Sequence, residues 1–479
     1  MTHTPPRAAA GLLLLFSLAG CALPRPPAAV DAPQAARWQA PLPHGGNVSD
    51  LTQWWTQFGD PLLVDLVEAA QTVSPTVATA GTRIAQARAA RIAAQSALLP
   101  SLDASVSVTR GNAQTGVPLS TLSQANLQTA WEVDVFGGRG AQADAAAARL
   151  RGAQAGWHDA RVAVAAETAT TYVDLRICER QLEVARNDAR SRAETSRLTG
   201  LSADAGFTAP AVAAQARASA AEAAARATQQ QAQCELATKA LVALTGLPEP
   251  QLRRRLASGW TEPAGIATAA IPALPADLLA QRPDVFAAGL EVAAASADVG
   301  AARADLYPRL TLTGQIGVGL LHAGGQTVGA QTWQIGPLAV SVPVFDAGRR
   351  EAQADAAVAR YEEAVLQYGA RVRQAVREVE DALVNLRSAH DRSEDARTAV
   401  EGYRASFAAA EARYRSGLGS LIELEDQRRV LLAAETALVG LQRDRVAAWI
   451  ALYRALGGGW HTAPGEAASE ARNNEEPTR

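Results

Sequence analysis

Aromatic residues are scarce in this sequence, and alanine is abundant. Phe, Trp and Tyr together make up 5% of the 479 residues, while alanine dominates tracts such as 221–227. Few aromatic side chains leave little material for a β-sandwich core or a deep ligand pocket, whereas alanine favours close-packed helices. The composition therefore predicts a mainly helical protein.

An excess of charge of one sign and clusters of metal ligands are also missing. The 45 Lys and Arg residues nearly balance the 48 Asp and Glu residues, and no dense basic block occurs, which excludes a nucleic-acid-binding protein. The cysteines Cys21, Cys178 and Cys234 form no CxxC motif, and the six histidines are scattered. The sequence shows no catalytic motif that combines a nucleophile, a general base and a residue that orients the base. We therefore expect no catalysis, no metal and no cofactor.

Long hydrophobic runs are absent except near the N-terminus. Residues 8–19 form an apolar stretch after Arg7 that is typical of a signal peptide. It ends in Leu18-Ala19-Gly20-Cys21, which resembles a bacterial lipobox. The resemblance implies a signal peptide at 1–20, acyl chains such as palmitate on Cys21, and an extended tether at 21–50. An ordinary secretory signal and an N-terminal core helix are the alternatives.

The chain contains an internal repeat of about 210 residues, far longer than the unit of a solenoid. Leu99-Pro100-Ser101-Leu102 matches Tyr307-Pro308-Arg309-Leu310. Val133-Asp134-Val135-Phe136-Gly137-Gly138-Arg139 matches Val342-Pro343-Val344-Phe345-Asp346-Ala347-Gly348-Arg349. A glycine-containing turn follows in both halves, near 206 and near 417. We expect half-repeats at 51–250 and 276–460, a linker at 251–275 and a disordered tail at 461–479.

Each half contains segments in which the hydrophobic period changes from helical to two, which indicates strands. Apolar and polar residues alternate in 101–109 and in 309–318, and the segments 127–136 and 333–345 are also extended. We expect hairpins at 101–136 and 309–345, with loops at 111–126 and 320–332. Runs of about 9–11 residues are long enough for tilted strands to cross a bilayer. A soluble two-sided sheet is the alternative.

Four strands cannot close a barrel, and open sheet edges are unstable in lipid because unpaired backbone groups there cost several kcal/mol each. The chain must therefore oligomerise, and bacterial barrels of about 8 or 12 strands would need two or three copies. If alternation turns the polar residues inward, side chains of the strands tune the selectivity of a passive, water-filled conduit. These pore-facing residues are Asp103, Ser105, Gln128, Glu132, Thr311, Thr313 and Gln315.

The remaining sequence predicts very long helices. Between Ala354 and Tyr414 apolar residues advance in steps of three and four over about 60 residues, which corresponds to about 90 Å of helix. The matching segment 140–200 contains no proline. Helices of this length project as rods. A plain dimeric coiled coil is the alternative, but it leaves the hairpins unexplained.

Five motifs together resemble one family, the NodT/OprM branch of TolC-like outer-membrane efflux channels. They are Trp54-Trp55-x-x-Phe58-x-Asp60-Pro61, Trp131-Glu132-Val133-Asp134-Val135-Phe136-Gly137, Arg282-Pro283-Asp284, Val344-Phe345-Asp346-Ala347-Gly348-Arg349 and Leu452-Tyr453-Arg454-Ala455-Leu456-Gly457-Gly458-Gly459-Trp460. The resemblance implies a mainly α fold with a membrane β-barrel part. Three protomers would share one 12-stranded barrel in outer-membrane lipid above a periplasmic α-helical barrel. It also implies a tripartite pump that exports small molecules, with a periplasmic adaptor protein and an inner-membrane RND-type pump as partners.

By the same resemblance, the turns near 206 and 417 form the periplasmic tip where channels close and adaptors dock. The adaptor-docking residues would be Ser202, Gly206, Thr208, Ser416, Gly417 and Ser420. Glu423, Glu425 and Asp426 lie just beyond the second turn, and we expect some of them to line the closed aperture. The alternative is an exposed first helical turn, where acidic residues are favoured in any case.

Cys178 and Cys234 flank the first turn symmetrically, because their midpoint is residue 206. Two antiparallel helices would bring them to the same level, and the oxidising periplasm would allow a disulfide between them. Two buried thiols are the alternative. For the whole protein, the alternatives are the outer-membrane channel of a type I protein secretion system and a periplasmic coiled-coil lipoprotein without a pore.

Overall fold

The computed structural model describes residues 23–31, 55, 58–112, 119–257, 260 and 282–460. Several predicted segments lie outside the described residues. They are the signal peptide 1–20, Cys21, most of the tether 21–50 and the tail 461–479.

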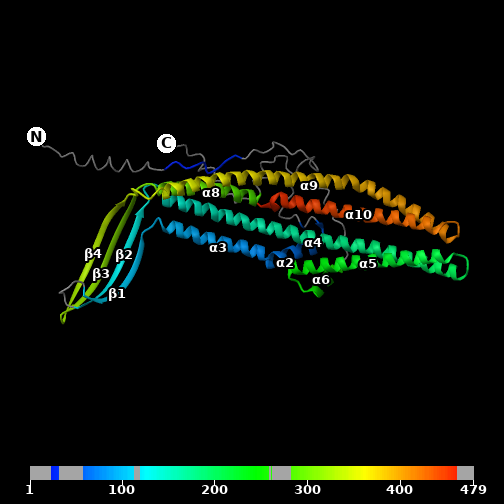
Figure 1. Ribbon diagram of the computed structural model, residues 1–479, viewed down its shortest axis with the longest axis horizontal. Coiled ribbons are helices and arrows are strands. Elements are labelled where there is room, and N and C mark those ends of the chain that lie inside the picture. The colour runs from blue at the N-terminus through cyan, green and yellow to red at the C-terminus, as the bar shows by residue number, and fades with distance from the viewer. Residues whose placement is uncertain are drawn as a thin grey trace. The chain divides into compact units, whose positions relative to one another are not determined.

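The same order of elements, helix, two strands and two long helices, occurs twice along the chain (Figure 1). The first half contains α3 (Pro75–Ser96), β1 (Ser101–Gly111), β2 (Ser120–Val133), α4 (Gly138–Asp204) and α5 (Pro210–Thr245). The second contains α8 (Pro283–Ala304), β3 (Arg309–Ala323), β4 (Gln326–Ser341), α9 (Arg349–Arg415) and α10 (Leu421–Ala455). The other described elements are α2 (Pro61–Val73), α6 (Glu249–Leu256) and the short η4 (Gly457–Gly459).

The two long helices form where the sequence predicts them. α4 and α9 each contain 67 residues and cover the predicted segments 140–200 and 354–414. The shorter helices that precede the strands, α3 and α8, end before Pro100 and Pro308. Proline disfavours helical backbone at the residue before it, so these two prolines separate helix from strand.

An aspartate caps the start of both long helices, but from different places in the repeat. Asp134, two residues before Phe136, accepts hydrogen bonds from the backbone N–H groups of Arg139 and Gly140 at 3.0 and 2.6 Å. Asp346, directly after the equivalent phenylalanine, accepts from the backbone N–H of Arg350 at 3.3 Å. Side-chain carboxylates at a helix start satisfy backbone donors that have no partner within the helix. The two halves thus meet the same requirement with differently placed aspartates.

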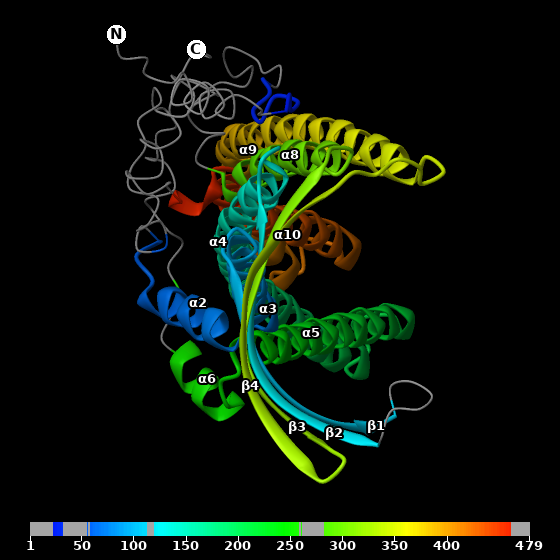
Figure 2. The ribbon, with the colours of Figure 1, turned by 90° about the vertical axis from the view of Figure 1, so that its left-hand side faces the viewer.

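The four strands form one antiparallel sheet in the order β1-β2-β3-β4 (Figure 2). Several predicted strand boundaries were wrong. β2 begins at Ser120, β3 continues to Ala323 and β4 begins at Gln326, so 120–126 and most of 320–332 are strand and not loop. The β3–β4 turn consists of Gly324 and Gly325, whose positive φ angles of 56° and 82° suit a two-residue hairpin. The polar and glycine-rich composition of these strand ends concealed their period-two pattern.

The chain folds into two compact units, and each unit draws on both halves of the repeat. Unit 1 combines Thr82–Ala155 and Ala287–Ala370 with the N-terminal segment, and it contains the sheet. Unit 2 combines Gly156–Phe286 and Arg371–Arg479 with the segment around α2. Long helices α4 and α9 contribute residues to both units. The units therefore do not coincide with the predicted half-repeats 51–250 and 276–460.

The two units have different cores. In unit 1 the buried residues Ala145 and Ala148 of α4 pack against Ala294 and Ala297 of α8, which small side chains allow at close range. In unit 2 larger residues form the core, and the largest fully buried side chain is Trp449. Trp55, Phe58 and Tyr453 join this core, with 4.5 Å between the ring centroids of Trp55 and Tyr453. The sequence motifs at 54–61 and 452–460 thus meet in one cluster.

The described N-terminal residues 23–31, which we call the strap, lie against the helices of unit 1. Arg25 forms an ion pair of 3.0 Å with Asp144. The hydroxyl groups of Ser296 and Tyr361 donate to the backbone carbonyls of Pro26 and Pro27 at 2.5 and 2.9 Å. The strap has too few residues to bury a core of its own, and these contacts fix it to α4, α8 and α9.

Among the described helices, α8 alone is long and apolar enough to cross a membrane by length and composition. Within its most apolar window 56% of the residues are buried. The buried helix of a soluble core passes the same test, so the composition of α8 is weak evidence for a membrane-spanning helix.

Candidate functional site

One face of the sheet carries all seven residues that the sequence predicts to face a pore. Directly opposed residues of an antiparallel sheet project to the same side. The register places Asp103 opposite Gln128, and Gln128 opposite Gln315. It also places Glu132 opposite Thr311. The polar face, as we call this side, is defined by Asp103, Ser105, Gln128, Glu132, Thr311, Thr313, Gln315 and the residues in register with them.

The opposite side of the sheet, the apolar face, is rich in exposed hydrophobic side chains. Val106 of β1 is 81% exposed and Trp333 of β4 is 75% exposed. The large apolar residues of this face are Leu102, Val106, Val108, Leu127, Ile316, Val318, Leu320, Trp333, Ile335, Leu338 and Val340. A contiguous patch of this kind is unfavourable in water and marks a surface that contacts lipid or another protein.

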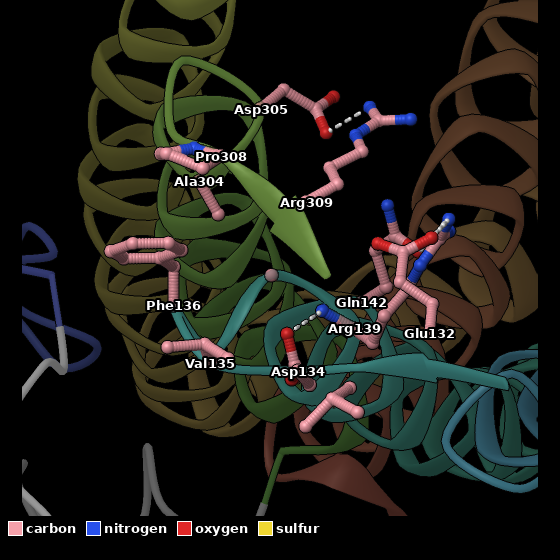
Figure 3. A pocket seen from close by; sticks show the side chains of 12 residues that line it. Glu132, Asp134, Val135, Phe136, Arg139, Gln142, Ala304, Asp305, Pro308 and Arg309 are labelled. Carbon is pink, nitrogen blue, oxygen red and sulfur yellow. Dashed lines mark hydrogen bonds and ion pairs between the residues drawn. The ribbon is translucent and has the colours of Figure 1, made fainter. Parts of the chain in front are cut away.

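Five charged residues gather where the strands join the helices of unit 1, and four of them form two ion pairs (Figure 3). Glu132, near the end of β2, forms a 2.8 Å ion pair with Arg139 of α4. Asp305, which follows α8, forms a 2.7 Å ion pair with Arg309 at the start of β3. We call Glu132, Arg139, Asp305 and Arg309 the junction charges. They line a cavity of about 30 Å³, together with Asp134 and Gln142.

A close helix contact brings the two ion pairs together. A Cβ atom on Gly138 would lie 2.7 Å from the Cβ of Ala304, so only glycine allows this approach of α4 to α8. The hydrogen bond from Arg139 to Glu132 raises the pKa of the guanidinium, and the charge of Asp305 adds to the effect although burial opposes it. The arginine is therefore held in its charged form beside both carboxylates.

The two predicted tip turns lie at the same end of unit 2 (Figure 1). Gly206 and Gly417 have φ angles of 80° and 76°, a left-handed conformation that favours glycine. In the α4–α5 turn the hydroxyl oxygens of Ser202 and Thr208 are 2.6 Å apart. In the α9–α10 turn Ser420 caps α10 by accepting from the backbone N–H of Glu423 at 3.1 Å. Ser416 donates its hydroxyl to the carbonyl of Ala412 at 2.9 Å.

The sequence prediction missed two hydrophobic residues at these turns. Phe207 and Leu418 directly follow the two turn glycines and are 87% and 76% exposed. Their equivalent positions in the two half-repeats were a signal that could have identified them. Each turn therefore presents an apolar side chain at its apex.

The three acidic residues predicted to line an aperture have different environments. Glu423 is partly exposed and pairs with Arg413 at 2.8 Å, and Asp426 is exposed and pairs with Arg429 at 3.1 Å. Glu425 is mostly buried instead, with 17% of its side chain exposed. It pairs with arginines from two helices, so its carboxylate has partners within the protomer. Only Glu423 and Asp426 present carboxylates to solvent.

The partners of Glu425 belong to a buried cluster that the sequence did not predict. Glu425 contacts Arg192 of α4 and Arg428 of α10, and it accepts a 2.9 Å hydrogen bond from Ser219 of α5. Asp188 forms a second ion pair with Arg192 at 2.9 Å. Burial lowers the pKa of Arg428, while the charge of Glu425 opposes this effect. We call Asp188, Arg192, Glu425 and Arg428 the buried charge cluster.

The two cysteines predicted to lie at the same level are adjacent in space. The structure joins Cys178 of α4 and Cys234 of α5 in a disulfide, with Cα atoms 5.5 Å apart. The side-chain amide of Gln230 donates to the sulfur of Cys178 at 3.2 Å. The formation of this bond in the cell remains a prediction.

A profile of the family "Outer membrane efflux protein" matches residues 66–247 and 274–458. The chain belongs to the outer membrane efflux protein family. It is 31% identical to the pyoverdine export outer membrane protein OpmQ of Pseudomonas putida over 95% of this chain and 98% of OpmQ. It is 27% identical to nodulation protein T of Rhizobium leguminosarum bv. trifolii over 90% of this chain and 95% of that protein.

Among solved structures, the fold is similar to that of the outer-membrane channel OprN. The TM-score is 0.81 at 31% sequence identity, and the match covers 91% of this chain and 99% of that chain. Family and fold together confirm the TolC-like architecture and an outer-membrane location. This efflux protein is the outer-membrane channel component of an export pump.

Proposed function

We propose that three copies of this efflux protein combine their sheets into one 12-stranded barrel, with the polar face around an aqueous lumen and the apolar face toward lipid. The observation that carries the proposal is the separation of the two faces. Polar residues follow one side of all four strands, with Leu122, Leu321 and Val328 as exceptions toward the hairpin ends, and most of the large apolar residues lie on the other side. Strands β1 and β4 are the edges of the sheet. Pairing them between protomers satisfies the backbone groups that lipid cannot.

Fluorescence quenching in lipid tests which face contacts the bilayer. The full-length protein is reconstituted with brominated lipids, and wild type is compared with Trp333→Phe and Trp449→Phe. We expect Trp333→Phe to remove a quenched component of the emission, because Trp333 is 75% exposed on the apolar face. Trp449 is 1% exposed in unit 2 and serves as the control. Equal quenching in wild type and Trp333→Phe would contradict the proposed orientation.

The number of protomers and the presence of a pore need a separate experiment. We expect light scattering of the detergent-solubilised protein to give the mass of a trimer. The same preparation should give stepwise conductance in planar bilayers. A monomeric protein without conductance would instead support the coiled-coil lipoprotein. Gene neighbourhood distinguishes an RND pump and adaptor from the ABC transporter of a type I secretion system.

The tip turns are the proposed docking site for a periplasmic adaptor protein. Support comes from their small and polar residues Ser202, Gly206, Thr208, Ser416, Gly417 and Ser420, and from the exposed apolar apices. We expect Phe207→Ser with Leu418→Ser to reduce drug export in cells that depend on this channel. Ile92→Ser, at a residue 61% exposed on α3, is the matched control. Loss of export in the control but not in the tip variant would contradict this site.

Glu423 and Asp426 are the proposed carboxylates of the closed aperture. Both lie in the first turns of α10, beside the tip, where Glu423 is partly exposed and Asp426 is exposed. We expect Glu423→Ala and Asp426→Ala to increase closed-state leakage in bilayers. Unchanged leakage in both variants would count against the aperture. The side chain of Glu425 is mostly buried between arginines of two helices, so we do not place its carboxylate in the lumen.

Cys21 is the proposed lipid attachment site, and it precedes the strap that docks on unit 1. Acyl chains on Cys21 would hold the strap near the membrane surface, because each buried CH₂ contributes about 0.8 kcal/mol. Metabolic labelling with an alkyne-modified palmitate should mark wild type and leave Cys21→Ser unlabelled. Labelling of Cys21→Ser would contradict this attachment site.

A further inference from the structure

The polar face of the described strands carries very few charged residues. The register assigns only Asp103, Glu132 and Arg309 to this face among the ionisable strand residues described. The rest of the face consists of Ser, Thr, Gln, Asn and small or aliphatic residues. Single charges in a lumen of this kind have a large influence on which ions pass.

Two of these three charged residues are neutralised locally. Glu132 is paired with Arg139, and Arg309 is paired with Asp305. Each ion pair is therefore neutral in itself, while Asp134, which lines the same cavity, accepts backbone hydrogen bonds at the start of α4 and adds one further negative charge. Figure 3 shows Glu132 and Arg139 directed toward each other, and Asp305 directed toward Arg309. Gly138, next to Arg139, lies in tight contact with Ala304, next to Asp305.

Asp103 has a different environment from the junction charges. It lies on β1 opposite Gln128 of β2 and has no ion-pair partner among the residues that the structure describes. Its side chain is exposed. Three symmetry-related copies would place three uncompensated carboxylates around one level of a trimeric lumen.

We infer that Asp103 sets the charge selectivity of the barrel in favour of cationic small molecules, and that the two junction ion pairs form a collar below it in which Glu132 and Arg309 are each compensated. This inference rests on the proposed trimeric barrel with its polar face inward. The compensation holds only while both ion pairs are intact. Removal of one member of a pair exposes the charge of the other to the lumen.

Reversal potentials in a KCl gradient test the inference on the full-length protein in planar bilayers. We expect Asp103→Asn to shift the K⁺/Cl⁻ permeability ratio toward Cl⁻. Glu132→Gln should shift it in the same direction, since Arg139 is left unpaired. Arg139→Gln should shift it toward K⁺, since Glu132 is left unpaired. The double variant Glu132→Gln/Arg139→Gln should return the ratio to the wild-type value.

Arg110→Gln is the matched control, because Arg110 lies on the same strand as Asp103 but on the apolar face. It changes the charge by one unit, in the opposite sense to Asp103→Asn, and should leave the permeability ratio unchanged. Arg139→Lys keeps the charge and separates an electrostatic effect from a structural one. An unchanged ratio in Asp103→Asn, or a shift of similar size toward K⁺ in Arg110→Gln, would overturn the inference. A wild-type protein without conductance would overturn the proposed function itself.

Discussion

Arg192 of α4 and Glu425 of α10 form an ion pair although 233 residues separate them in the sequence. Only 9% of the Arg192 side chain and 17% of the Glu425 side chain are exposed. Glu425 also pairs with Arg428, which is 3% exposed and whose Nε atom has no hydrogen-bond partner. Glu425 thus contacts two buried guanidinium groups, and one of them, Arg192, also pairs with Asp188. The pair joins two helices of unit 2 near the tip.

Glu425→Gln should strongly destabilise unit 2. The variant leaves two buried arginines with one carboxylate, that of Asp188, and removal of one partner from a buried ion pair costs about 3–5 kcal/mol. Glu423→Gln is the control, because its ion pair with Arg413 is exposed and exposed pairs contribute about 0–1 kcal/mol. Thermal unfolding followed by circular dichroism measures both. Equal losses in the two variants would show that the cluster contributes no more than a surface ion pair.

The disulfide between Cys178 and Cys234 should stabilise the α4–α5 hairpin. Its sequence separation of 56 residues corresponds to about 4 kcal/mol of lost chain entropy in the unfolded state. Peptide mass spectrometry without reduction should detect the linked peptides. Cys178→Ser with Cys234→Ser should lower the unfolding temperature to that of reduced wild type, and a reducing agent should have no further effect on it. Detection of only unlinked thiols would contradict the bond.

Two glycines of the second half-repeat should respond oppositely to alanine. Gly417 has a φ of 76°, so Gly417→Ala should cost about 1–2 kcal/mol. Gly402 lies within α9 with no atom within 4 Å of an added Cβ, so Gly402→Ala should gain up to about 1 kcal/mol. Denaturant titrations measure both changes. A destabilised Gly402→Ala would show that this segment of α9 needs the flexibility of glycine.

Two neighbouring carboxylates of unit 2 should give opposite pH dependence. Burial alone would raise the pKa of Asp284, but its 2.8 Å ion pair with Arg282 outweighs this and holds the pKa below its usual value. Burial, together with the charge of Asp284, raises the pKa of Asp159. Ionised Asp284 therefore stabilises the fold at neutral pH, whereas ionised Asp159 destabilises it.

The matched variants are Asp284→Asn and Asp159→Asn, compared by unfolding temperature between pH 3 and pH 7. Asp284→Asn should be less stable than wild type at neutral pH, and the difference should shrink as the pH falls below about 4 and wild-type Asp284 becomes protonated. Asp159→Asn should be more stable than wild type at neutral pH and equal to it in acid. A constant difference across this range would contradict the assigned pKa shifts.

Strands and helices could be predicted from the sequence where their hydrophobic residues recur every two residues or every three to four residues. Period-two segments identified four strands, and the heptad pattern identified α9 almost to its ends. The symmetric placement of Cys178 and Cys234 about Gly206 followed from the geometry of two antiparallel helices. The starts of β2 and β4 were missed, because Ser, Thr, Gln and Gly give little contrast between the two faces of a strand.

The sequence by itself determined the element order, the duplication, the strand faces and the turn glycines, since these depend on the backbone geometry of neighbouring residues. Only the tertiary structure decided which charges are paired. In the folded protein Arg192 pairs with Glu425, and the strap is hydrogen-bonded to α8 and α9. Asp103 has no ion-pair partner among the described residues. Contacts of this kind depend on how distant segments pack against each other, and no local pattern in the chain records that packing.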